Sequence, residues 1–153
     1  MKDWKLYVKT ILVPVVLGGI VGWFMSSSIM YDNLIQPPLA PPSFLFPIVW
    51  TILYILMGVS YGLLVQNGQD SENISSIYYL QLFVNLLWPL FFFVLQWRLF
   101  AFFWLLLLIG LVIVMIIRFY RNHKGAGLLQ IPYLLWLFFA AYLNLSIYIL
   151  NEQ

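Results

Sequence analysis

Apolar residues make up 64% of this chain of 153 residues and charged residues 8%, whereas globular domains average about 45–50% and about 25%. The net charge of +2 is too small to indicate a nucleic-acid partner, and the absence of cysteine excludes disulfides, thiolate catalysis and cysteine metal sites. The single histidine, His123, cannot build a metal site alone, so the composition points to a lipid bilayer.

Five apolar stretches are long enough to cross a bilayer as helices, which takes about 20 residues each. They cover about residues 6–29, 44–65, 77–95, 99–117 and 128–150. The runs are continuous rather than alternating, so a transmembrane β-barrel is not expected. We therefore expect an all-α integral membrane protein in which residues 1–153 form one domain, a five-helix bundle.

The first stretch also has features of a signal peptide, with a basic start and small residues at its end. Its apolar run is longer than a usual signal core. Gly18 and Gly22 form a GxxxG pair suited to helix packing, which favours an uncleaved span.

The connections differ in chemistry. The first, Tyr31–Ser43, is rich in proline, so it is expected to be stiff and extended and to act as a lid over the mouth of the bundle. The second, Gln66–Ser76, is polar, the third is the short turn Gln96–Arg98, and the fourth, Arg118–Gly127, is a basic loop.

The Lys and Arg residues set an expected orientation. The N-terminus and the second and fourth connections share Lys2, Lys5, Lys9, Arg118, Arg121 and Lys124, whereas the other side holds only Arg98. Because cytoplasmic loops carry the excess of Lys and Arg, the N-terminus is predicted to be cytoplasmic and the C-terminus external.

The predicted spans carry almost no titratable side chains. No Asp, Glu, Arg or His lies in the middle of a span, which argues against proton relays and hydrolytic catalysis. We expect no catalytic residues, no metal ligands and no required cofactor.

Aromatic and amide residues instead form three stripes at helical spacing. These are Phe46, Trp50 and Tyr54; Asn85, Trp88 and Pro89; and Trp136, Ala140, Leu143 and Asn144. Converging stripes would make a flat-walled pocket in which two amides and the indole N–H groups are available to hydrogen-bond a ligand. Spacing alone favours the alternative, in which the stripes only pack helices together. The remaining tryptophans suit anchoring at the membrane interface: Trp4, Trp23, Trp97 and Trp104.

Three motifs carry a resemblance to a known family. They are the run from Tyr31 through Pro37-Pro38-Leu39-Ala40-Pro41-Pro42 to Phe46–Tyr54; Gln81, Asn85, Trp88 and Phe91-Phe92; and Pro132-Tyr133, Trp136, Phe139-Ala140, Leu143 and Asn144. Their order and spacing over nearly the whole chain resemble the translocator protein (TspO, peripheral benzodiazepine receptor) family.

The resemblance implies a five-helix bundle of the bacterial type in the cell membrane, often a homodimer. Such proteins, also called tryptophan-rich sensory proteins, bind porphyrins and other flat aromatic molecules under the first loop. The matching motif positions imply a ligand site made by Tyr31, Pro41, Phe46, Trp50, Tyr54, Asn85, Trp88, Trp136, Ala140, Leu143 and Asn144.

This chain departs from the family pattern in its first loop and at its end. Gln36 and Leu39 stand where the family usually has a lysine and a tryptophan, so a cation that pairs with a ligand carboxylate is missing. No basic residue follows Tyr148, so the expected sterol pattern is missing too.

The functional hypothesis is a membrane receptor or carrier for tetrapyrroles, with a role in their metabolism or in stress. The alternatives are a light-dependent porphyrin-degrading oxidase acting through Trp50 and Trp136, a sterol- or lipid-binding transport protein, and a structural membrane protein.

Overall fold

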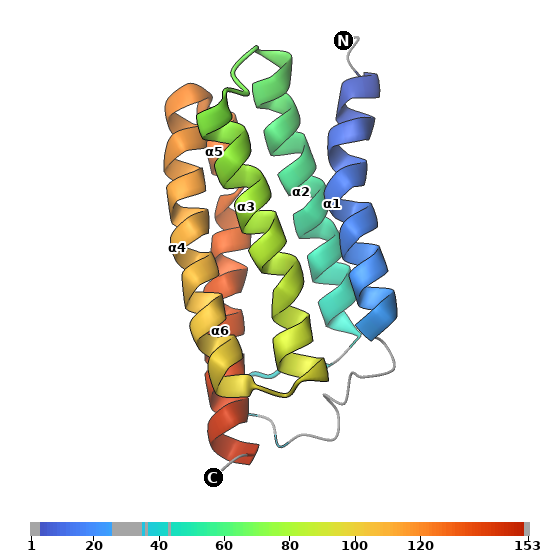
Figure 1. Ribbon diagram of the computed structural model, residues 1–153, viewed down its shortest axis with the longest axis vertical. Coiled ribbons are helices and arrows are strands. Elements are labelled where there is room, and N and C mark those ends of the chain that lie inside the picture. The colour runs from blue at the N-terminus through green and yellow to red at the C-terminus, as the bar shows by residue number, and fades with distance from the viewer. Residues whose placement is uncertain (1–3, 26–34, 36, 43, 152–153) are drawn as a thin grey trace.

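The computed structural model describes residues 4–25, 35, 37–42 and 44–151. Its long helices run side by side along one axis (Figure 1): α1 (Trp4–Met25), α2 (Leu45–Gln66), α3 (Glu72–Pro89), α4 (Arg98–Asn122) and α6 (Ile131–Asn151). Two short elements accompany them, the π-helix η2 (Leu90–Val94) after α3 and the helix α5 (Lys124–Leu128) before α6. The described residues contain five helical segments long and apolar enough to cross a membrane, with α5 and α6 counted as one. The predicted all-α, five-helix membrane fold is confirmed.

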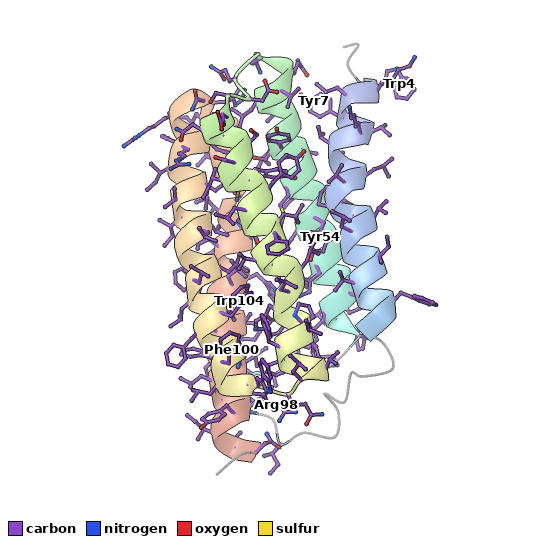
Figure 2. The ribbon with its side chains drawn as sticks, in the orientation of Figure 1. Trp4, Tyr7, Tyr54, Arg98, Phe100 and Trp104 are labelled. Carbon is purple, nitrogen blue, oxygen red and sulfur yellow. The ribbon has the colours of Figure 1, made fainter. Side chains whose placement is uncertain are left out.

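Glycines let α1 pack closely along α2. At Gly58 a Cβ would overlap the backbone of Ile11 and lie 2.7 Å from the carbonyl oxygen of Thr10. Pro14 lacks the N–H that would bond to this carbonyl in a regular helix. The carbonyl that the proline leaves without its helical partner is therefore the one that Gly58 approaches. One turn later, Gly62 lies against the side chains of Tyr7 and Thr10, and Tyr7 is seen between the two helices (Figure 2).

The predicted GxxxG pair of α1 divides between two roles. A Cβ at Gly18 would overlap the ring of Tyr54 on α2, so this glycine is a packing contact. A Cβ at Gly22 would meet nothing within 4 Å. Only half of the pair therefore packs against a neighbouring helix.

The predicted basic loop between the last two spans is wrong. Residues 118–122 continue α4, and α5 begins at Lys124. His123 separates the two helices and caps α5, because its Nδ1 accepts a hydrogen bond from the N–H of Ala126 at 3.1 Å. Gly127 then packs against the backbone of Tyr120, which brings the chain back toward the bundle.

Pro89 changes the end of the third span. Its missing N–H breaks the regular α-helical ladder, and the wider π-helix η2 follows directly. The turn after η2 is closed by hydrogen bonds from Leu95 N–H to the Leu90 carbonyl at 2.9 Å and from Trp97 N–H to the Phe91 carbonyl at 2.9 Å.

One predicted interface anchor has another role. Trp4 extends outward from the start of α1, as expected of an anchor (Figure 2). Trp104 instead packs against the core and donates from Nε1 to the Val84 carbonyl at 2.8 Å, which ties α4 to α3.

Candidate functional site

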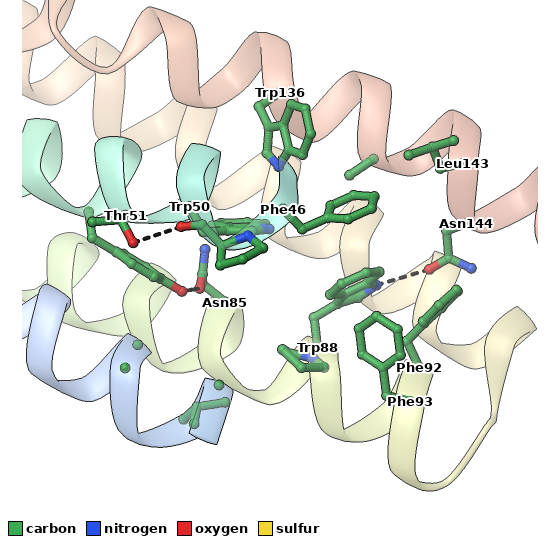
Figure 3. Close-up of a pocket in the computed structure, with 18 of the residues that line it drawn as sticks. Phe46, Trp50, Thr51, Asn85, Trp88, Phe92, Phe93, Trp136, Leu143 and Asn144 are labelled. Carbon is green, nitrogen blue, oxygen red and sulfur yellow. Dashed lines mark hydrogen bonds between the residues drawn. The ribbon is translucent and has the colours of Figure 1, made fainter. Parts of the chain in front are cut away.

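A cavity of about 550 Å³ lies between α1, α2, the α3–η2 segment and α6 (Figure 3). It is lined by nine of the residues predicted from spacing and family motifs: Phe46, Trp50, Tyr54, Asn85, Trp88, Trp136, Ala140, Leu143 and Asn144. Pro41 is described but does not line the cavity, and Tyr31 lies outside the described residues. The three stripes therefore converge rather than being spread over separate packing faces.

Seven of the 20 lining residues are aromatic, and Trp50 contacts two of the other rings. Its ring meets that of Trp136 nearly at a right angle, with centroids 6.5 Å apart, and lies 5.7 Å from the ring of Tyr54. Phe46 also contacts Trp136 edge-on, at 5.9 Å. Rings held edge to face present both flat faces and edges, so this wall suits a planar apolar molecule.

The Asn85 carboxamide is not a free polar handle. The Tyr54 hydroxyl donates to its Oδ1 at 2.7 Å, and its Nδ2 donates to the Tyr133 hydroxyl at 2.8 Å. Tyr133 donates onward to Oε1 of Gln81 at 2.8 Å. This buried chain joins α2, α3 and α6 and uses one donor and one acceptor position of the Asn85 carboxamide.

The Asn144 carboxamide is occupied in the same way. The Trp88 Nε1 donates to Asn144 Oδ1 at 2.9 Å, a contact drawn in Figure 3. Asn144 Nδ2 in turn donates to the main-chain carbonyl of Arg98 at 2.8 Å. Asn85, Asn144 and the Trp88 N–H therefore hold helices together, and a role for the two amides as ligand contacts stays a prediction that would use their remaining N–H and acceptor positions.

Trp136 retains an available donor. Its Nε1 is buried and has no hydrogen-bond partner among the described residues. In Figure 3 this nitrogen points toward Phe46 and Trp50 on α2. An unpaired buried donor costs about 1–3 kcal/mol, so an acceptor that reached this nitrogen would be stabilised.

Several lining residues were not predicted. Gly19 and Gly22 of α1 face the cavity, and a Cβ at either would meet nothing within 4 Å. Phe92 and Phe93 come from η2, where the ring of Phe92 stacks on that of Trp88 at 5.0 Å. The glycine-rich run of α1 was a usable signal for an open face, whereas Pro89 signalled an irregular helix end without indicating a π-helix.

The cavity wall carries no formal charge in the part of the chain that the structure describes. Its lining contains no Asp, Glu, Lys, Arg or His, and its polar side chains are amides, hydroxyls and indoles. Such a wall favours an uncharged guest, because a buried charge without a partner is costly.

Comparison with known proteins identifies relatives over nearly the whole chain. Residues 10–150 match the model of the TspO/MBR family. The "Tryptophan-rich protein TspO" of Archaeoglobus fulgidus is 35% identical over 94% of this chain and 95% of its own. The "Tryptophan-rich sensory protein" of Cereibacter sphaeroides is 31% identical over 97% and 93%, and the "Translocator protein homolog" of Schizosaccharomyces pombe is 36% identical over 92% and 88%. The resemblance read from the three motifs is thereby confirmed, and the chain belongs to the TspO/MBR family.

Proposed function

We propose that this protein is a membrane receptor or carrier that binds tetrapyrroles or similar flat aromatic molecules in the cavity between α1, α2, α3 and α6. Family membership and the sensory and translocator names of its relatives support a membrane sensory or transport role. The finer proposal, tetrapyrroles as the ligand class, comes from the family resemblance, and the apolar, aromatic lining of the cavity supports a flat, mostly apolar guest.

The single observation that carries the proposal is an empty cavity enclosed by aromatic and other apolar side chains. The buried indole N–H of Trp136, which is one of the lining residues, has no partner among the described residues. The cavity volume of about 550 Å³ lies within the roughly 300–1,000 Å³ of known ligand sites. A well-packed interface would have filled this space, and the empty volume supports a binding site.

A titration of the detergent-solubilised protein with protoporphyrin tests the proposal. Quenching of tryptophan fluorescence is expected to saturate. Trp136→Phe keeps an aromatic ring but removes the N–H, so the affinity should fall about five- to tenfold.

Trp97→Phe is the matched control, because Trp97 is 53% exposed and lies outside the cavity lining. Its affinity should equal that of the wild type. Quenching that never saturates, or that is the same in all three proteins, would show that the cavity is not the site.

The uncharged lining makes a second test possible with the same ligand class. Ionised carboxylates would find no cation in the described wall, so they must stay at its mouth. The dimethyl ester of protoporphyrin should therefore bind at least as tightly as the free acid. Markedly weaker binding of the ester would place a cation in contact with the ligand.

The edge-to-face contact of Trp50 and Trp136 supports one other candidate, light-dependent degradation of bound porphyrin. Indoles within van der Waals reach of an excited porphyrin are oxidisable. A new absorption band should then form under light in the wild type and be lost in both Trp50→Phe and Trp136→Phe. Bleaching at the rate seen without protein would eliminate this activity.

A further inference from the structure

One side of α1 packs against α2, and the opposite side is exposed. Tyr7 and Gly18 both approach residues of α2. Lys9, Leu12 and Val16 recur at helical spacing on the opposite side, and all three are exposed. Because α1 lies at one edge of the bundle (Figure 1), this side faces lipid in a membrane.

A shallow groove runs along the exposed side, and all the residues that line it belong to α1. Lys5 and Lys9 line its N-terminal end, one helical turn apart. Leu12, Val16 and Leu17 continue the groove toward the middle of the helix. The groove is therefore basic at one end and apolar along the rest.

Two exposed tryptophans bound the membrane-crossing part of α1. Trp4 and Trp23 are 65% and 73% exposed, and they are the ends of an apolar segment of 20 residues. At about 1.5 Å per residue this segment is about 30 Å long, which is the thickness of the hydrocarbon core of a bilayer. Because tryptophan prefers the membrane interface, Lys5 lies at the level of the headgroups and Lys9 lies about 7 Å inside the level of Trp4.

Lys9 has no counter-charge among the residues that the structure describes. The acidic residues in this part of the chain are Asp70 and Glu72, near the connection between α2 and α3, and neither pairs with a lysine of the groove. The Lys5 ammonium lies 5.7 Å from the centroid of the Trp4 ring. A cation below the interface is costly without a partner, and a lysine stem is long enough to turn its ammonium toward the headgroups. An anion at the headgroup level would therefore meet both lysines.

We propose that the outer side of α1 binds one anionic phospholipid from the leaflet at the N-terminal end of the bundle. The phosphate lies between the ammonium groups of Lys5 and Lys9, and one acyl chain follows Leu12 and Val16. A phospholipid has its parts in the same order as the groove, with an anionic head followed by an apolar chain. None of the groove residues lines the aromatic cavity, so this site does not depend on the function proposed above.

Native mass spectrometry of the full chain in detergent counts the lipids that stay bound. With palmitoyl-oleoyl phosphatidylglycerol added, the wild type should retain one lipid per chain, in preference to the zwitterionic phosphatidylcholine. Lys5→Gln combined with Lys9→Gln should lower the affinity for phosphatidylglycerol about 25-fold, because each cation near an anionic lipid contributes about a factor of five.

Arg121→Gln combined with Lys124→Gln is the matched control. This pair removes two exposed cations from the same end of the bundle, but neither residue lines the groove. Its affinity for phosphatidylglycerol should equal that of the wild type. Circular dichroism should give the same helix content in all three proteins, so that lost binding is separated from unfolding.

A second pair of variants tests the position of the acyl chain. Val16→Phe places a ring in the groove and should lower the affinity for phosphatidylglycerol about fivefold, because the ring overpacks the space that the chain would occupy. Ile20→Phe is its control, since Ile20 is also exposed on α1 but does not line the groove. Glycerol phosphate in large excess should leave the lipid bound, because it offers the anion without the chains.

Three results would overturn the site. Equal retention of phosphatidylglycerol and phosphatidylcholine by the wild type would remove the role of the two lysines. An equal loss of affinity in both double-glutamine variants would mean that binding follows net charge alone. Displacement by glycerol phosphate, or an unchanged affinity in Val16→Phe, would mean that the groove does not hold a lipid chain.

Discussion

Ala140 shows how a single small side chain distinguishes a site from a packing face. It lies on α6 one turn after Trp136 and one turn before Asn144, and it is only 6% exposed. It lines the cavity and also belongs to the buried core cluster of the bundle. Which of the two contacts dominates decides how the bundle responds to a larger side chain here.

Ala140→Leu should lower ligand affinity at least about tenfold while leaving the thermal midpoint nearly unchanged. The larger side chain fills empty cavity, so it avoids the overpacking cost of about 1–3 kcal/mol that a packed position would impose. Fluorescence titration and thermal unfolding of the same preparation measure both quantities. A destabilised protein with normal affinity would mean that the position is a packing contact.

Leu39 adopts a backbone conformation that suits glycine. Its φ is +73°, and the Ala40 N–H bonds to the Pro37 carbonyl at 3.3 Å, which closes a turn with Leu39 at its third position. Turns of this kind usually have glycine there. The Leu39 side chain is 82% exposed and contributes little packing.

Leu39→Gly should therefore raise the thermal midpoint. It removes a left-handed backbone cost of about 1–2 kcal/mol, which exceeds the roughly 0.5–1 kcal/mol of added chain entropy. Leu39→Ala keeps the cost and should give no gain. If alanine and glycine have the same effect, the strain is not the cause.

At the scale of the helices, α1 depends on α2 for its place in the bundle. Among the five segments that are able to cross a membrane, α1 is the least buried by the rest of the protein. Only 11% of its most apolar stretch is buried. Close approach at Gly58 is what aligns the face of Gly18, Gly19 and Gly22 with the cavity. Such a contact between backbones is held by dispersion forces, and small residues allow the close approach that it needs.

Gly58→Ala should lower the thermal midpoint and enlarge or distort the cavity, because the added Cβ would overlap the backbone of α1. Gly110→Ala on α4 is the control: a Cβ there meets nothing within 4 Å, and alanine favours a helix by about 1 kcal/mol over glycine. The two variants should change stability in opposite directions. A tolerated Gly58→Ala would mean that α1 is able to shift without cost.

At the scale of the whole molecule, the two ends of the chain lie at opposite ends of the bundle (Figure 1). One end of the bundle, where α1 begins and α4 ends, holds Lys5, Lys9, Arg118, Arg121 and Lys124. Arg98 begins α4 at the other end. The predicted orientation, with a cytoplasmic N-terminus, follows from this asymmetry.

Reporter fusions at the two termini measure the orientation. A cytoplasm-dependent reporter should be active at the N-terminus and a reporter that needs an external location should be active at the C-terminus. Moving three lysines or arginines to the opposite end should weaken or reverse the preference. Activity of both reporters in the same compartment would contradict an odd number of spans.

The sequence alone determined the number of spans and the faces of three of them. Lipid cannot hydrogen-bond a backbone, so each span must be a long apolar helix, and this requirement is readable in any window of residues. The stripes of Phe46 and Trp50, of Asn85 and Trp88, and of Trp136 and Ala140 follow from helical spacing alone. These are local properties of the chain.

Only the tertiary structure decided which groups are available at the site. Trp88 and Asn144 are 56 residues apart and Asn85 and Tyr133 are 48 apart, yet each pair forms a hydrogen bond. Whether an amide is free depends on which helix faces it, and no local pattern specifies that. The unpaired N–H of Trp136, the aromatic wall added by η2 and the hydrogen bonds between Asn151 and Ile35 were decided in the same way, because each depends on neighbours that the fold brings together from distant parts of the chain.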